Sequence, residues 1–239
     1  MIVPLQRQQG AALLLLVAVL GLGAATLLIN AFGRNSAESV RQQRTLAALA
    51  QAREALLGYA ASNGRLPRPA ASALDGRERL DDCLDDAQCS GFLPWVALGV
   101  AGSDGWGRLL RYSVTPEMTR APIVSFSAVA NRTVSTRDAN GALRFIAGQE
   151  QCDVSAQCLP LVLLSQGPGN YGTAVSGVRQ ASLARGNLDE AHNDSASTGF
   201  VSRPATASAQ APGGAFDDML TWLTVPTLYQ RMRAARNLP

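Results

Sequence analysis

The sequence predicts an α+β protein in which a long N-terminal helix packs on a mainly antiparallel β-sheet head. Three observations lead to this class. Residues 11–29 are almost wholly apolar and uncharged, residues 36–62 repeat apolar side chains at helical spacing, and short apolar segments separated by Gly, Pro, Asp and Asn fill the chain after residue 64. Because the predicted strands follow the helix and do not alternate with further helices, the class is α+β and not α/β.

The apolar run at residues 11–29 predicts the membrane half of that helix. Nineteen residues at 1.5 Å each extend about 28 Å, close to the thickness of a bilayer core. Arg7 favours a cytoplasmic N-terminus, so we expect a single-pass protein of a bacterial inner membrane with everything after Asn30 in the periplasm. A cleaved signal peptide is an alternative, because residues 23–25 (Gly-Ala-Ala) could be a cleavage site, and a plain membrane anchor is another.

Residues 30–63 predict the amphipathic half of the helix. Leu46, Leu49, Leu56 and Ala60 form one stripe at helical spacing, which we expect to pack on the head. No proline interrupts the chain between Leu5 and Pro67, so both halves could be one helix. Asn63-Gly64 is a typical helix end.

Residues 64–239 predict the head. The dipeptide Asp104-Gly105 indicates a turn, after which Trp106, Leu110 and Tyr112 share one face of a strand. Gly107 completes the pattern D-x-W-G-x4-Y. Further strands are predicted at 123–130, 142–146, 160–165 and 219–225, a terminal helix at 227–234 and a mobile loop at 205–214.

Four cysteines occur in two pairs of equal spacing, Cys83 with Cys89 and Cys152 with Cys158. The spacing of five intervening residues does not fit the usual zinc-binding pairs, and an exported domain lies in an oxidising compartment. We therefore expect disulfides. Three connectivities are possible, and we favour local pairing because each small loop can close by itself.

The composition excludes most catalytic chemistry. All 21 basic residues are Arg, which removes lysine chemistry, and His192 is the single histidine. A net charge of +3 argues against capture of nucleic acid. No G-x-S-x-G sequence is present, so we expect no catalytic residues and no enzyme.

Two loops need a separate interpretation. Residues 167–172 fit the dinucleotide pattern G-x-G-x-x-G, but Pro168 and the missing βαβ scaffold favour a glycine-rich turn after a strand. Asp189, Glu190 and Asp194 form an acidic loop. They are weak candidates for calcium, because the spacing of a calcium-binding loop is missing, and a solvated loop is favoured. We expect no other metal or cofactor.

Residues 7–10 (RQQG), a charged leader that ends in glycine directly before the apolar run, resemble the prepilin leader of type IV pilins and type II secretion pseudopilins. The pattern from Asp104 to Tyr112 is similar to one in pseudopilin heads. The resemblance implies a pilin-like fold, cleavage by prepilin peptidase between Gly10 and Ala11, and methylation of the new N-terminus at Ala11.

The same resemblance implies a non-enzymatic subunit of a type IV pilus or type II secretion system. Its partners would be other pilin or pseudopilin subunits, prepilin peptidase and the inner-membrane assembly platform. Family members usually have Glu at mature position five, where this chain has Leu15. Minor subunits often lack that Glu, so we expect a tip-proximal or initiating role. The alternative is a membrane-anchored periplasmic binding module that is not assembled into a fibre.

Overall fold

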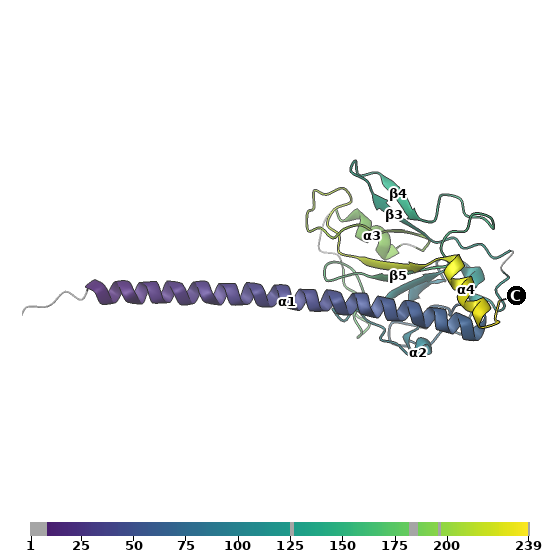
Figure 1. Ribbon diagram of the computed structural model, residues 1–239, viewed down its shortest axis with the longest axis horizontal. Helices are drawn as coiled ribbons and strands as arrows, with labels where there is room; N and C mark the ends of the chain where they lie inside the picture. The colour runs from purple at the N-terminus through teal and green to yellow at the C-terminus, as the bar shows by residue number, and fades with distance from the viewer. Residues whose placement is uncertain (1–8, 125–126, 182–185, 196, 239) are drawn as a thin grey trace, which may run out of the picture. The chain divides into compact units, whose positions relative to one another are not determined.

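The computed structural model describes residues 9–124, 127–181, 186–195 and 197–238; within the first helix it describes the side chains of residues 14–23 and 36–63 (Figure 1). The helices are α1 (Gln9–Asn63), α2 (Trp95–Leu98), the 3-10 helix η1 (Pro116–Thr119), α3 (Leu188–Ser195) and α4 (Val225–Ala234). The strands are β1 (Ser90–Phe92), β2 (Arg111–Val114), β3 (Thr133–Arg137), β4 (Leu143–Ala147), β5 (Leu161–Ser165), β6 (Gly199–Val201) and β7 (Met219–Leu223).

The chain divides into two compact units, Met1–Gln42 and Gln43–Pro239, and α1 contributes to both. Within the described residues, no helical segment is both long and apolar enough to cross a membrane. The described part of the apolar run is residues 14–23, which is about 15 Å at 1.5 Å per residue, against a bilayer core of about 30 Å. The longer described stretch, residues 36–63, contains five charged residues.

The predicted fold class therefore needs correction. The expected membrane half of the helix is not found in the described part of the chain, so the pilin-like arrangement as we predicted it is wrong. The expected single-pass location in a bacterial inner membrane with a periplasmic head is wrong for the same reason. The class that the structure supports is α+β with an antiparallel sheet.

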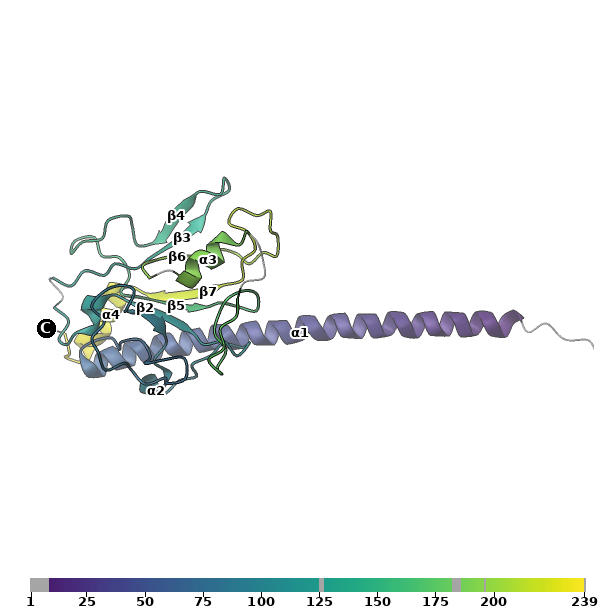
Figure 2. The ribbon, with the colours of Figure 1, turned by 180° about the vertical axis from the view of Figure 1, so that it is seen from behind.

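Two sheets form the second unit (Figure 2). The larger has the order β1-β2-β5-β7, and all of its neighbouring strands are antiparallel. The smaller has the order β4-β3-β6, in which β3 pairs with β4 antiparallel and with β6 parallel. The second sheet and its parallel pair were not expected from the sequence.

The main core lies between the larger sheet and two helices, α4 and the part of α1 after Gln43. Leu49, Leu56 and Ala60 of α1 are buried in it, as the predicted stripe requires, whereas Leu46 is exposed. Along β5 the faces alternate, so that Leu161 and Leu163 join the main core. Val162 joins a smaller cluster with Val134 and Phe200 of the second sheet. β5 is thus buried on both faces.

Local signals located several elements correctly. The predicted strands at 142–146, 160–165 and 219–225 correspond to β4, β5 and β7, and the terminal helix to α4. Gly64 ends α1 with a φ of 70° while its N–H donates to the carbonyl of Ala60. The strand predicted at 123–130 is wrong, since its described residues form turns and coil. The acidic loop is also wrong, since it forms α3.

Candidate assembly surface, head motif and acidic cluster

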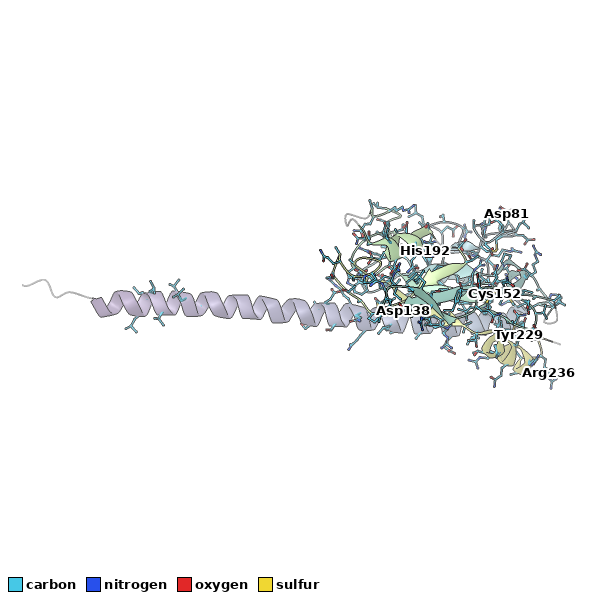
Figure 3. All side chains as sticks on the ribbon, turned by 90° about the horizontal axis from the view of Figure 1, so that it is seen from above. Asp81, Asp138, Cys152, His192, Tyr229 and Arg236 are labelled. Atoms are coloured by element: carbon cyan, nitrogen blue, oxygen red, sulfur yellow. A yellow bond between two sulfur atoms is a disulfide. The ribbon has the colours of Figure 1, made fainter. Side chains whose placement is uncertain are left out.

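The first unit presents an apolar surface on every side of α1. Seven large apolar side chains in this segment are 59–72% exposed: Leu14, Leu15, Leu16, Val17, Val19, Leu20 and Leu22. Consecutive helix residues are about 100° apart, so these side chains surround the helix axis, as Figure 3 shows. A helix that is apolar all round is normally buried against other apolar groups. We call these seven residues the assembly surface.

The predicted processing site lies at the start of α1. Gly10 and Ala11 fall within the helix, but their surroundings and the Ala11 side chain lie outside the described residues. Cleavage between Gly10 and Ala11, and methylation of Ala11, stay predictions.

The head motif forms the turn that the sequence predicts. Asp104 is buried, and its Oδ1 accepts hydrogen bonds from the amides of Trp106 and Arg108, both at 2.9 Å. Gly107 has a φ of 76°, a conformation that glycine adopts without strain. The Thr45 hydroxyl accepts a 2.9 Å hydrogen bond from the Gly105 amide, which ties the turn to α1. The motif thus positions the head on the second part of α1.

Tyr112 anchors the same region from β2. Its side chain is buried, and its hydroxyl donates a 2.9 Å hydrogen bond to the carbonyl of Pro67. Burial raises the pKa of Tyr112 well above its ordinary value, so the hydroxyl keeps its proton. Trp106, in contrast, is half-buried and lies in the turn, because β2 begins only at Arg111. The prediction that Trp106 shares a strand face with Leu110 and Tyr112 is therefore wrong.

Both predicted disulfides are present, with local pairing. Cys83 bonds Cys89 and Cys152 bonds Cys158, with Cα–Cα distances of 5.1 Å and 5.6 Å. Among the described residues no cysteine is free. Disulfide formation leaves none of the four available as a thiolate ligand or nucleophile.

The glycine-rich loop after β5 is occupied by an arginine. The Arg108 guanidinium donates to four backbone carbonyls of this loop: Gln166 (3.2 Å), Pro168 (2.7 Å), Gly169 (2.9 Å) and Asn170 (3.4 Å). A phosphate-binding loop instead directs amide N–H groups at its ligand. The interpretation of residues 167–172 as a turn after a strand is therefore confirmed.

The structure separates the three calcium candidates. Asp189 accepts hydrogen bonds from Arg137 and Arg203, so its carboxylate is committed to two ion pairs. Asp194 is paired with Arg179. Glu190 instead lies with two carboxylates that sequence reasoning missed.

Glu190, Asp217 and Asp218 form an acidic cluster. Each contributes one carboxylate oxygen, and these oxygens lie within 4.8 Å of one another. Both Glu190 oxygens already accept hydrogen bonds, Oε1 from the Asp217 amide and Oε2 from the Asn170 and Asn187 side chains. The cluster therefore ties α3 to the start of β7 and to the glycine-rich loop. Calcium binding by Asp189, Glu190 and Asp194 was only a weak alternative in the sequence, and no observation here tests it.

Asp218 is almost completely enclosed by the protein and its carboxyl has a strongly raised pKa. Burial raises its pKa well above the ordinary value, the hydrogen bond from Asn193 lowers it, and the charges of Glu190 and Asp217 raise it further. The signal in the sequence was the adjacent pair Asp217-Asp218 directly before an apolar strand. Nothing in the spacing indicated that Glu190 would meet this pair.

His192 is the remaining candidate for acid–base chemistry. Its Nε2 lies 2.9 Å from the backbone carbonyl oxygen of Gly199. Asp194, an acidic residue near it in the sequence that could assist such chemistry, is instead paired with Arg179.

A comparison with protein-family models finds no match, and neither a curated protein nor a solved structure matches the chain.

Proposed function

We propose that this chain is a non-enzymatic, pilin-like subunit of a type IV pilus or type II secretion fibre. The observation that carries the proposal is the assembly surface, residues 14–22 of α1, with its apolar side chains exposed on all sides. Burial of apolar side chains contributes about 25 cal/mol per Å². Helices of neighbouring fibre subunits would supply the apolar surface that covers it.

The second unit supports a structural role. Its core is continuous with α1 through Leu49, Leu56 and Ala60, and two disulfides close loops of the head. The part of α1 after Gln43 is therefore held firmly in the head. Prepilin peptidase and the assembly platform are the further partners that the leader implies.

Leu15 supports a minor, tip-proximal role. Its side chain is apolar and 67% exposed, where the resemblance calls for a carboxylate that neutralises a neighbour's N-terminal amine. A subunit without that carboxylate docks poorly beneath another subunit, and at a tip no such neighbour exists. Leu15→Glu should leave processing intact and increase the number of copies in the shaft.

Leu16→Asp tests the assembly surface. We expect it to abolish incorporation into sheared fibres, because a desolvated carboxylate is costly in an apolar interface. Leu80→Asp is the matched control, since Leu80 is 93% exposed on the head. Quantitative mass spectrometry of the sheared fibres measures incorporation, and equal incorporation of both variants would refute the proposal. A wild-type abundance typical of a major shaft protein would also refute it.

Processing is tested independently by the mature N-terminus. In cells that contain prepilin peptidase we expect a chain that begins at methylated Ala11, and Gly10→Leu should retain the leader. Gly21→Leu is the control, because a Cβ at Gly21 would meet no atom within 4 Å. A start at Met1 in the wild type, or an unchanged mature mass in Gly10→Leu, would exclude prepilin processing.

A further inference from the structure

A pocket of about 260 Å³ opens in the second unit, beside strands β1 and β2. It shares no lining residue with the acidic cluster. The residues that line it and enter the argument are Phe92, Arg111, Gln166, Thr173, Arg179 and Asp194.

Arg111 is held in this pocket by one end of its guanidinium group. Its Nη1 donates to the backbone carbonyls of Asn193, at 3.0 Å, and Asp194, at the end of α3. Among the described residues, its Nε and Nη2 donate to no acceptor and no carboxylate forms an ion pair with it. Nε and Nη2 lie on one edge of the guanidinium, and this edge can bind a carboxylate with two parallel hydrogen bonds.

The charge of Arg111 is incompletely balanced. Burial lowers the pKa of Arg111; the carboxylates of Asp194 and Asp218 raise it, while the guanidinium of Arg179 lowers it. A partly buried cation without a hydrogen-bonded counterion is less favourable than a paired one. A carboxylate bound at Nε and Nη2 would supply that counterion.

The carboxylate already in the pocket is engaged elsewhere. Asp194 Oδ1 accepts a 2.8 Å hydrogen bond from Gln166, and Oδ2 accepts one from Arg179. Two guanidinium groups and one carboxylate line the pocket, so the lining carries one excess positive charge. Its electrostatics therefore favour an anionic ligand over a cationic one.

We propose that this pocket binds a carboxylate group, which docks side-on against Nε and Nη2 of Arg111. Phe92 and Thr173 would border the rest of the ligand. The carboxylate could belong to a free organic acid or to an acidic side chain of another protein, and the two sources are distinguished by the probe.

The binding experiment uses the full-length chain, labelled with ¹⁵N, in a mild detergent that covers residues 14–22. Sodium acetate and the tripeptide N-acetyl-Gly-Glu-Gly-amide are titrated, with sodium chloride and N-acetyl-Gly-Gln-Gly-amide as matched controls. The readout is the Nε–Hε resonance of Arg111. A saturable shift with acetate and an equal or weaker one with the Glu tripeptide supports a free organic acid as ligand. Binding of the Glu tripeptide at least about tenfold tighter than acetate supports an acidic side chain.

The proposal is overturned if neither carboxylate shifts the resonance, or if chloride and the Gln tripeptide shift it equally. For the variants the side-chain amide resonances of Gln166, which lines the same pocket, replace the Arg111 resonance as the readout. Arg111→Gln should weaken binding by about tenfold or more, whereas Arg233→Gln removes an exposed arginine on α4 and should leave binding unchanged.

Arg111→Gln also removes hydrogen bonds to the end of α3, so a second pair of variants keeps the test independent of folding. Thr173→Glu places a carboxylate in the pocket and Thr173→Gln is its uncharged match. We expect Thr173→Glu to melt at a higher temperature than Thr173→Gln and to lose the response to acetate. Equal melting temperatures together with an unchanged acetate response would overturn the proposal.

Discussion

The two disulfide loops have equal spacing and share the ending Ala-Gln-Cys, yet the structure uses them differently. Cys83 and Cys89 are both fully buried in the main core. In the other loop Cys158 is buried, but Cys152 is only half-buried and its neighbours in the sequence are exposed (Figure 3). Two disulfide rings of equal size therefore differ in position: the first belongs to the core and the second lies largely at the surface.

The glutamine before the second cysteine of each loop also differs between the two loops, but here it is the second loop that makes the contacts with the rest of the protein. Gln88 is exposed, and its Oε1 accepts a 3.1 Å hydrogen bond from the Leu84 amide within its own loop. Gln157 reaches out of its loop, where it accepts from the Ala130 amide at 2.7 Å and donates to the Ala128 carbonyl at 3.0 Å. The first loop is fixed through its sulfurs, and the second through its glutamine. The contacts around each loop, and not the cysteine spacing, therefore decide how much the loop contributes to the stability of the fold.

Removal of each disulfide tests this contrast and should give the largest effect. Both rings have a sequence separation of 6, so the loop-entropy contribution is about 2–3 kcal/mol for each. Cys83→Ala with Cys89→Ala also removes two sulfurs from a close-packed core, so we expect a total loss of about 4 kcal/mol. Cys152→Ala with Cys158→Ala should cost about 2–3 kcal/mol. Urea denaturation under oxidising conditions measures both, and equal losses would contradict the contrast.

Asp86 provides the next largest effect, because it connects the first loop to a buried arginine. Arg132 has a side chain that is 0% exposed, and its Nη1 donates to Asp86 Oδ1 at 2.5 Å. Burial lowers the pKa of Arg132 and the hydrogen bond to Asp86 raises it. Asp86→Ala should lower the free energy of unfolding by about 2–3 kcal/mol, less than for a fully buried pair because Asp86 is 37% exposed.

Ser155 is the matched control for Asp86, since it occupies the same position in the second loop. Its described side-chain contact is a 2.7 Å hydrogen bond to Asp153 in the same loop. Ser155→Ala should therefore change stability by less than about 0.5 kcal/mol. A loss similar to that of Asp86→Ala would show that the two loops do not differ in this respect.

For the two glutamines, substitution in the second loop should cost more stability than substitution in the first loop, the opposite of the order expected for the disulfides. Gln157→Ala leaves the amide of buried Ala130 without its acceptor, which costs about 1–2 kcal/mol. Gln88→Ala exposes the Leu84 amide to water and should cost less than about 0.5 kcal/mol. Denaturation of both variants, with hydrogen exchange at Ala130 as a local readout, checks the difference. An unchanged exchange rate at Ala130 in Gln157→Ala would contradict it.

The sequence predicted those features whose causes are local. Gly64 ends α1 because glycine adopts a positive φ, and Cys83 pairs with Cys89 because six residues can close a ring without help from the fold. β5 was predictable as a short run of apolar residues before a glycine-rich turn. The continuous stripe from Leu49 to Ala60 likewise needed only helical spacing.

The sequence did not predict features that depend on distant partners. Glu190 meets Asp217 and Asp218 from another element, and Arg108 fills a loop about 60 residues further along the chain. β1 and β6 have three residues each, too few for a periodic signal. The membrane prediction failed for another reason: it needed the whole apolar run at residues 11–29, and no described helical segment is long and apolar enough.

The smallest effect concerns pH and the exposed end of the second loop. Hydrogen bonds from the Ser155 hydroxyl and from the amides of Ala156 and Ser155 lower the pKa of Asp153, slightly opposed by desolvation. A carboxyl with a lowered pKa in the folded state stabilises the fold above its unfolded pKa, about 3.9, and loses that contribution as pH falls through the folded value. Asp153→Asn should therefore be less stable than the wild type at pH 6 and equally stable at pH 2.

The first loop has no carboxylate at the matching position, which is Leu84. Leu84→Asn is therefore the control and should show no such pH dependence. Thermal melts of both variants from pH 2 to pH 6 measure the difference, and a pH-independent effect of Asp153→Asn would mean that the hydrogen bonds, and not the charge, stabilise the second loop.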